Sequence, residues 1–325
     1  ILHLADLHLG KRVNEMSMIE DQKYILDQII TLIKEESVGI VLLCGDIYDK
    51  SIPTIEAIHL LDEFLDQLSK MAIKVLMISG NHDSIDRLSF GKSLFTRSNL
   101  YIASQFENEI EKITVKENGI TVNFYMLPFV KSAYISHIFQ LQTDSYEECF
   151  RYLIEHTKID EEETNILLSH QFVTANKKNP ELSDSETSSL GGIDNIDFHI
   201  FDPFDYVALG HIHKPEIIFE DLMAYSGSLE PLDRTETGSH GFIEGEISEE
   251  KQQIEFVPFA KRMYIQVEVM ITEEMSASEI KDRIETELSY RGKDNIYEVV
   301  LTGSIDSEIE IDFDDIKEDY LISDI

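Results

Sequence analysis

The chain has 325 residues, an apolar content of 42% and a formal net charge of −36. This length indicates about two domains, and the apolar content is enough to form a sizeable core. A charge of this sign repels polyanions, which argues against a protein that binds nucleic acid by itself. No apolar run is long enough to span a membrane. The two cysteines indicate a reducing, cytoplasmic compartment.

The first 80 residues alternate between strand and helix patterns. Ser17 and Glu20 have the spacing of a capping box at the start of the first helix. The apolar runs of strand length are continuous, as expected for strands buried on both faces of an α/β sheet. The predicted elements are strands at residues 1–5, 40–44 and 73–78 and helices at residues 18–36 and from residue 53 onward.

Shorter elements follow in the middle of the chain. Asn118 and Gly119 separate two apolar runs and predict the turn of a β-hairpin. Residues 174–192 are polar and predict a long loop of the kind that is often functional. The remaining predictions are hairpins at 113–126 and 242–257, a helix at 145–158, and strands at 165–169 and 205–209.

Lys261 and Arg262 mark a predicted domain boundary, which divides the chain into residues 1–260 and 261–325. Beyond it, Ser276 and Glu279 form another predicted capping box. The patterns predict a strand at 264–271, a helix ending near 290, a strand at 296–301 and an acidic edge strand at 307–313.

Five short polar signatures each follow a strand-like apolar run. Alone, each is most often surface or turn chemistry, but their conjunction indicates metal binding. In an extended segment, side chains at i and i+2 point to the same side, so a pair with this spacing can hold one ion together. The other histidines have no such context and are expected to be ordinary. The candidate residues are Asp6 and His8, Asp46, Asn81 and His82, His170, and His211 and His213.

The ligand types predict which ions bind and what they do. A mixture of carboxylate, amide and imidazole ligands indicates Mn²⁺, Fe²⁺ or Zn²⁺, in contrast to the all-oxygen cages of Ca²⁺ or Mg²⁺. Two such ions about 3.5–4 Å apart, sharing a carboxylate, clamp a phosphate for in-line displacement. Asp46 is placed to be the shared carboxylate. His82 is then expected to lie near the phosphate and to protonate the leaving oxygen.

In this order, the signatures resemble those of the calcineurin-like metallophosphoesterase superfamily. Longer stretches are similar to the SbcD-like family of bacterial DNA-repair nucleases. They are Ala-Asp-Leu-His-Leu-Gly-Lys at 5–11, Gly-Asn-His-Asp-Ser at 80–84 with Arg-Leu-Ser-Phe at 87–90, Ser-Asp-Ser-Glu at 183–186, Ala-Leu-Gly-His-Ile-His at 208–213 and Tyr-Ser-Gly-Ser at 225–228.

The resemblance implies an α/β fold with two mixed β-sheets packed face to face and flanked by helices, plus a small α+β capping domain at 261–325. It implies one ion on Asp6, His8, Asp46 and His213, and the other on Asp46, Asn81, His170 and His211. It also gives His82 the acid role. Asp49 is assigned no role, and Lys11, Arg12 and Arg87 are candidates for phosphate contacts.

The same resemblance implies a Mn²⁺-dependent DNA nuclease, with 3′-to-5′ double-strand exonuclease and endonuclease activities, that acts in DNA repair and recombination. Such nucleases form homodimers and bind a coiled-coil ATPase of the SbcC type, giving a heterotetramer. The C-terminal helices that bind the ATPase are not evident before Ile325. Two alternatives remain open. One is a phosphodiesterase acting on small nucleotides, which the acidity favours, and the other is a scaffold subunit with a vestigial site.

Overall fold

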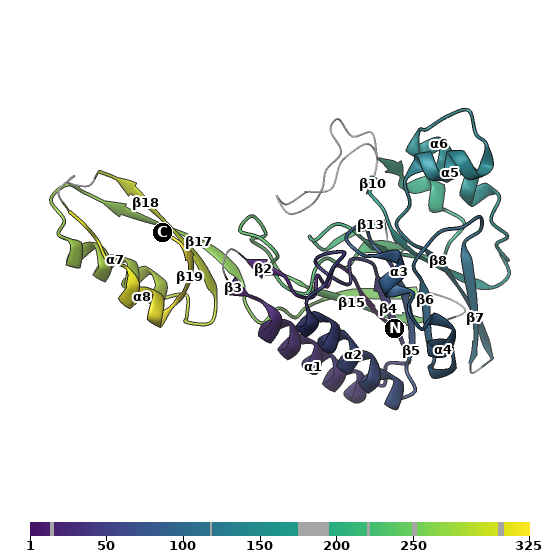
Figure 1. Cartoon of the computed structure of the whole chain (residues 1–325), viewed down its shortest axis with the longest axis horizontal. Coiled ribbons are helices and arrows are strands. Elements are labelled where there is room, and N and C mark those ends of the chain that lie inside the picture. The colour runs from purple at the N-terminus through teal and green to yellow at the C-terminus, as the bar shows by residue number, and fades with distance from the viewer. Residues whose placement is uncertain (14–15, 118, 175–194, 220–221, 249–251, 305–308) are drawn as a thin grey trace.

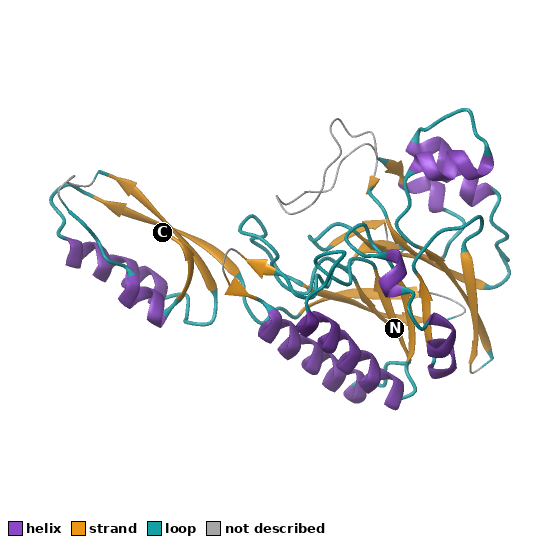
Figure 2. Cartoon of the chain, in the orientation of Figure 1, coloured by secondary structure: helices purple, strands orange, loops and turns teal. Residues whose placement is uncertain are grey.

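The structure is a computed structural model that describes residues 1–325 except 14–15, 118, 175–194, 220–221, 249–251 and 305–308. A large body contains two β-sheets, and a smaller lobe formed by the C-terminal residues projects from it (Figure 1). Long helices cover the body on one side, and the lobe has helices of its own (Figure 2). Within the described residues, no helix has both the length and the apolarity that a membrane span requires.

The first sheet has six strands in the order β16-β15-β1-β4-β5-β6. Strands β1, β4, β5 and β6 are parallel to one another, and β15 pairs with β1 in antiparallel orientation. Helices α1 (Ile19–Glu35) and α2 (Ile55–Lys70) bury their apolar sides against its outer face. The strands are β1 (Leu2–Leu4), β4 (Ile40–Cys44), β5 (Lys74–Ile78), β6 (Leu100–Ala103), β15 (Gly241–Ile247) and β16 (Gln252–Pro258).

The second sheet also has six strands, in the order β13-β14-β12-β9-β8-β7. Strands β8, β9, β12 and β14 are parallel, whereas the two edge strands are antiparallel to their neighbours. Its outer face is covered by α5 (Ser132–Phe139), α6 (Tyr146–Glu155) and η2 (Phe198–Phe201). The strands are β7 (Glu111–Glu117), β8 (Ile120–Leu127), β9 (Thr164–His170), β12 (Tyr206–Gly210), β13 (Glu216–Phe219) and β14 (Met223–Tyr225).

A third apolar layer lies between the two sheets. Leu42 and Ile78 of the first sheet share this core with Phe124 and Leu168 of the second, and all four side chains are fully buried. The central strands are therefore buried on both faces, which is why their sequences are continuous apolar runs. The predicted fold class, two mixed sheets face to face with flanking helices, is confirmed.

The predicted capping box at the first helix is wrong. Ser17 lies in a short hairpin, where it pairs with Arg12, and α1 begins two residues later with Met18 as its N-cap. A residue held in a strand pair cannot turn its side chain to the helix end. The remaining short elements of the body are β2 (Arg12–Val13), β3 (Met16–Ser17), α3 (Ile85–Leu88), α4 (Lys92–Phe95), η1 (Thr96–Ser98), β10 (Val173–Thr174) and β11 (Ile196–Asp197).

The lobe contains a separate three-stranded sheet in the order β17-β18-β19. Its apolar cluster includes Ile280, Ile284 and Tyr297 and is distinct from the three clusters of the body sheets. The boundary between residues 260 and 261 stays a prediction with which this separate core agrees. The elements of the lobe are β17 (Tyr264–Ile271), α7 (Ala277–Ser289), β18 (Ile296–Gly303), α8 (Asp314–Asp319) and β19 (Leu321–Asp324).

Two predictions in the lobe had different outcomes. The capping box is confirmed, because Ser276 and Glu279 exchange hydrogen bonds at the start of α7. The edge strand at 307–313 is wrong: residues 309–313 form no strand, and β19 takes the place beside β18. Ile311 and Phe313 still pack on the lobe core, which accounts for their alternation with acids.

The other predicted strands and helices are confirmed within a few residues at their ends. The turn residue Asn118, most of the predicted loop at 174–192 and the Ser-Asp-Ser-Glu stretch at 183–186 lie outside the described residues.

Candidate metal centre

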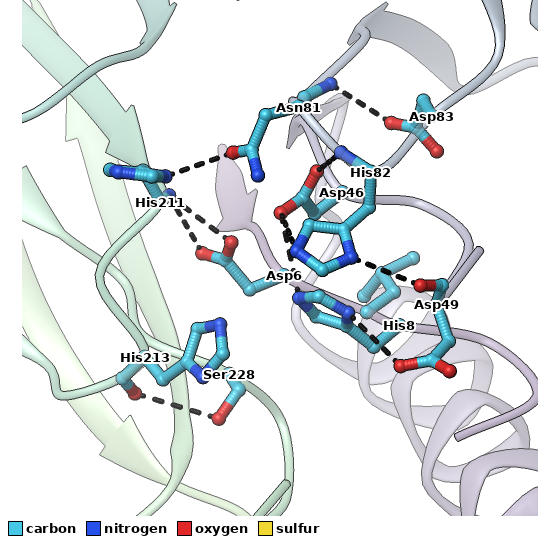
Figure 3. Close-up of polar contacts among 12 residues, drawn as sticks. Asp6, His8, Asp46, Asp49, Asn81, His82, Asp83, His211, His213 and Ser228 are labelled. Atoms are coloured by element: carbon cyan, nitrogen blue, oxygen red, sulfur yellow. Dashed lines mark hydrogen bonds and ion pairs between the residues drawn. The ribbon is translucent and has the colours of Figure 1, made fainter. Parts of the chain in front are cut away.

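The polar signatures meet where parallel strands of both sheets end. Asp6 and His8 follow β1, Asp46 follows β4 and Asn81 follows β5. From the second sheet, His170 ends β9, and His211 and His213 follow β12. Because the carboxyl ends of parallel strands lie at one edge, segments up to 205 residues apart come together here, as the hydrogen bonds from His211 to Asp6 show (Figure 3).

Two groups of side chains are close enough to hold ions. Asp6, His8 and His213 form the first group, and Asp6, Asp46 and His170 form the second. In each group the ligand atoms lie within 4.8 Å of one another, and every member is buried. The sequence thus predicted every residue of both groups.

Asn81 and His211 extend the second group. The Asn81 Oδ1 atom is 3.1 Å from His170 Nε2 and 3.0 Å from His211 Nδ1. Asp46 belongs to the second group and also faces the first, with its Oδ2 atom 3.3 Å from His170 Nε2 and 3.6 Å from His8 Nε2. This position suits a carboxylate that bridges two ions, and the predicted division of ligands between the ions remains a prediction.

The backbone at these residues is strained. Asp6, His8, Asp46 and His211 have φ of 51°, 39°, 48° and 97°. Non-glycine residues rarely adopt such values, which cost on the order of 1–3 kcal/mol each and tend to occur at functional sites. The strain allows each side chain to turn sharply from the end of its strand toward the others.

Glycines precede three of the ligands for a steric reason. At Gly80, a Cβ atom would overlap the carboxylate and the amide of Asp46. At Gly210, it would overlap the carbonyl of Cys44 and approach His170 Nδ1 to 2.8 Å. Loops of the same sheet, as at Gly80, or of the two sheets, as at Gly210, can approach this closely only where one of them lacks a side chain.

His8 provides a test of whether a metal ion fits here. Its side chain is 1% exposed, and each ring nitrogen has only a carboxylate oxygen at 3.6 Å, Asp46 Oδ2 for Nε2 and Asp49 Oδ1 for Nδ1, which is beyond hydrogen-bond distance. Buried polar atoms without hydrogen bonds cost free energy and are uncommon. An ion coordinated by this imidazole would remove that cost, so the donor set and the burial both fit a divalent metal.

Burial and the neighbouring carboxylates act in opposite directions on the pKa values of the imidazoles. It lowers the pKa of His8 to about 4 and the pKa of His211 to about 3, so both rings are neutral and can coordinate an ion. Burial alone would also lower the pKa of His170, but the carboxylate of Asp46, followed by that of Asp6, outweighs it and raises the value to about 9. Burial raises the pKa of Asp6 to about 7.

His82 lies beside the ligands but is more exposed, with 28% of its side chain accessible. Its backbone N–H donates to Asp46 Oδ1 at 2.8 Å, and its Nδ1 is 3.0 Å from the carbonyl oxygen of Asp49. With Nδ1–H donating to this carbonyl, Nε2 is the nitrogen that faces the site, 3.9 Å from Asp46 Oδ2. The acid role predicted for His82 requires a second proton on Nε2, which the imidazolium form supplies.

The predicted phosphate contacts are less well placed. Lys11 Nζ is 3.3 Å from Asp49 Oδ1, so the lysine charge is already paired near the site. Arg12 is exposed on β2 and Arg87 is exposed on α3. Their role in binding phosphate stays a prediction.

The sequence did not reveal the residues that hold the ligand loops in place. The Asp83 carboxylate accepts the N–H groups of Ile47, Tyr48 and Gly80, and so ties the loops after β4 and β5 together. Glu236 contacts His213 at 2.7 Å. Asp83 was visible within Gly-Asn-His-Asp, whereas Glu236 belongs to no motif and has no local signal.

Comparison with known proteins identifies the family. The family model of the calcineurin-like phosphoesterases matches residues 1–215, which include every predicted ligand. The chain belongs to the calcineurin-like phosphoesterase family. As a phosphoesterase of this family with two groups of metal-binding residues, it is a hydrolase of phosphate esters with a site for two divalent ions.

A solved structure is also similar to this phosphoesterase. It is the crystal structure of a dimetal phosphatase from Danio rerio, with a TM-score of 0.42 and 14% sequence identity, and the match covers 78% of this chain and 97% of that chain. A similarity of this size does not indicate a shared substrate.

Proposed function

We propose that the protein is a metal-dependent DNA nuclease of the SbcD type, with 3′-to-5′ exonuclease activity on duplex ends and endonuclease activity. The observation that carries the proposal is the convergence of seven predicted ligands and His82 at one sheet edge. The choice of DNA as the substrate is supported by the resemblance of the motifs at residues 5–11, 80–90 and 208–228 to SbcD-like nucleases.

The side chains divide the work of phosphodiester hydrolysis. The seven predicted ligands would hold two divalent ions, Mn²⁺ in our proposal, which would supply an activated water and neutralise charge on the phosphate. Asp46 holds its carboxylate between the two groups of ligands, and its other oxygen accepts the His82 N–H. His82, kept in place by that bond and by the Asp49 carbonyl, gives a proton to the leaving oxygen.

Partners are part of the proposal. Exposed apolar side chains occur at the start of α2 and in the α3–α4 region, with Ile52 72%, Ile55 69% and Phe90 82% exposed. Exposed apolar surface of this kind supports a homodimer. We further propose that the dimer binds a coiled-coil ATPase of the SbcC type as a heterotetramer. A reducing, nucleoid-associated location in the cytoplasm agrees with two buried, unbridged cysteines.

The test is digestion of a linear duplex by the purified chain in Mn²⁺. His211→Ala removes one ligand, and His199→Ala is the matched control because His199 is an exposed histidine outside the site. We expect cleavage by the wild type and by H199A, and its loss in H211A. Cleavage that survives in H211A would contradict a nuclease mechanism that uses this site.

The phosphodiesterase of small nucleotides remains the second candidate, and the net charge of −36 favours it. In the same assay, the wild type would then hydrolyse a generic phosphodiester reporter and free nucleotides, but not DNA. If neither DNA nor the reporter is hydrolysed, the scaffold with a vestigial site becomes the better explanation. DNA cleavage that appears only after an SbcC-type ATPase is added would show a nuclease subunit that needs its partner, and would argue against both alternatives.

A further inference from the structure

The two metal-binding groups differ in the segments that form hydrogen bonds to their histidines. In the second group, His170 Nδ1 lies 2.8 Å from the carbonyl oxygen of Cys44, at the end of β4 in the core. In the first group, His8 and His213 are supported by α1 and by residues 226–240, which belong to neither large sheet. The N–H of His8 donates to the Asp46 carbonyl at 3.0 Å, so the peripheral segments support His213 and the carbonyl side of His8.

Glu236 supports His213. Its Oε1 atom is 2.7 Å from His213 Nδ1, and both side chains are almost fully buried, at 4% and 3% exposure. Its other oxygen accepts the Leu232 N–H at 2.8 Å, which fixes the carboxylate. A carboxylate that accepts the Nδ1 proton sets the tautomer and makes Nε2 the nitrogen that can coordinate an ion.

Gln22 of α1 supports the loop that carries His8. Its amide nitrogen donates to the His8 carbonyl at 3.0 Å, and its amide oxygen accepts the Gly10 N–H at 2.9 Å. The side chain is 3% exposed, so these bonds are protected from water. A movement of α1 would thus be transmitted to the backbone of His8.

The C-terminal lobe and its linker contact both supports. Asp21, the neighbour of Gln22, pairs with Lys261 and Arg262 of the linker. Arg234, two residues before Glu236, lies 3.7 Å from Glu298 on β18 of the lobe. One small apolar cluster also joins the β2–β3 hairpin to the lobe, and it contains Val13, Met18, Tyr264 and Ile296.

We propose that Gln22 and Glu236 are positioning residues for His8 and His213. We also propose that the lobe, through its contacts with Asp21 and Arg234, sets the affinity for the ion of the first group, called here the first ion. A substrate or partner that displaces the lobe changes the occupancy of this ion and leaves the ion of Asp46 and His170 in place. The proposal rests on the two-ion centre of the family and not on the choice of DNA as substrate.

The experiment measures Mn²⁺ binding to the purified full chain without substrate, by titration calorimetry and by electron paramagnetic resonance. Glu236→Ala tests the positioning role, Asp21→Ala tests the contact with the linker, and Glu216→Ala is the control because Glu216 is exposed on β13. We expect two ions in the wild type and in E216A. In E236A, one ion is expected to bind about 10–100-fold more weakly. At limiting Mn²⁺, the paramagnetic resonance spectrum of E236A should then be that of a single isolated ion, in place of the spectrum of two magnetically coupled ions. D21A weakens the same ion to a smaller extent.

The outcomes separate the parts of the proposal. E236A with two ions of wild-type affinity, or with both ions weakened equally, overturns the role of Glu236. D21A with unchanged affinities overturns the coupling to the lobe. Glu236→Gln keeps an oxygen that can accept the Nδ1 proton and is expected to weaken the first ion less, so it decides the matter if E236A does not fold. Because no substrate is present, failure of DNA cleavage leaves this test unaffected.

Discussion

The carboxylates at the edge of the two large sheets and those of the C-terminal lobe differ in their exposure to solvent. At the edge, Asp6 and Asp46 are 0% and 2% exposed and lie among imidazoles. In the described part of the lobe most acids are exposed, as at Asp315, whose side chain is 82% exposed even though it pairs with Lys281. Such exposed pairs contribute little to stability, whereas a buried carboxylate requires partners or an ion. The net charge of −36 therefore says little about the chemistry at the edge.

The largest effect is expected at the edge, from His82→Ala. Loss of a general acid should lower kcat about 10²–10⁴-fold, while Mn²⁺ binding stays near the wild-type value because our proposal places His82 beside the ligands and not on an ion. Metal analysis and phosphodiester hydrolysis on the same sample check this. His59→Ala on the exposed side of α2 is the control, and equal rates in H82A and wild type would show that His82 is not the acid.

A core substitution in the lobe tests whether the two regions are independent. Ile280 is fully buried in the lobe cluster, so Ile280→Ala should lower the free energy of unfolding of the lobe by about 2–5 kcal/mol. Urea unfolding should then show an earlier transition for the lobe, while the body stays folded and keeps the ion of Asp46 and His170. A single transition shared by body and lobe would argue against a domain boundary at residues 260–261.

Two glycine substitutions, one at a crowded position and one at an open position, test whether the ligand loops must pack closely. Gly80→Ala would force the new methyl group into Asp46, and the overpacking should cost about 1–3 kcal/mol and weaken metal binding. Gly238→Ala is the matched control, because a Cβ atom there meets nothing within 4 Å. Thermal unfolding with and without Mn²⁺ measures both effects. If G80A binds Mn²⁺ like G238A, the close approach of the loops is not needed for the site.

The smallest expected effect is a dependence on pH at Glu230, which is 3% exposed. Burial, and then the charge of Asp21, raise the pKa of Glu230 well above 4.5. The folded chain keeps a proton that the unfolded chain loses, so the contribution of this group to stability falls as pH rises from 4.5 toward the raised pKa. Glu230→Gln cannot lose that proton.

The stability of E230Q relative to wild type should therefore increase between about pH 5 and pH 8. The check is urea unfolding of both proteins at the two pH values. A difference that does not change with pH would mean that Glu230 titrates alike in the folded and unfolded chains.

Local patterns were sufficient for most of the strands and helices and for the candidate ligands, whereas the arrangement of two sheets face to face was predicted from the family resemblance. Each ligand follows a continuous apolar run, and the run is apolar because its strand is buried between two layers, as at residues 40–44 before Asp46. Glycines such as Gly80 and Gly210 also stood beside the ligands in the sequence, because the loops pack too closely for a side chain. Burial and steric crowding restrict which residues can stand next to the ligands in the sequence. The strands and the candidate ligands could therefore be predicted from the sequence alone.

Contacts between distant segments were decided only by the tertiary structure. Ser17 has the pattern of a helix cap, yet its pairing with Arg12 prevents that role. Glu236 meets His213 across 23 residues without a motif, and Asp21 meets Lys261 across 240. A local pattern reports which face of an element is buried, but the partner on the other side is set by how the sheets and the lobe pack. The ligands could therefore be predicted from the sequence, whereas the residues that hold them could not.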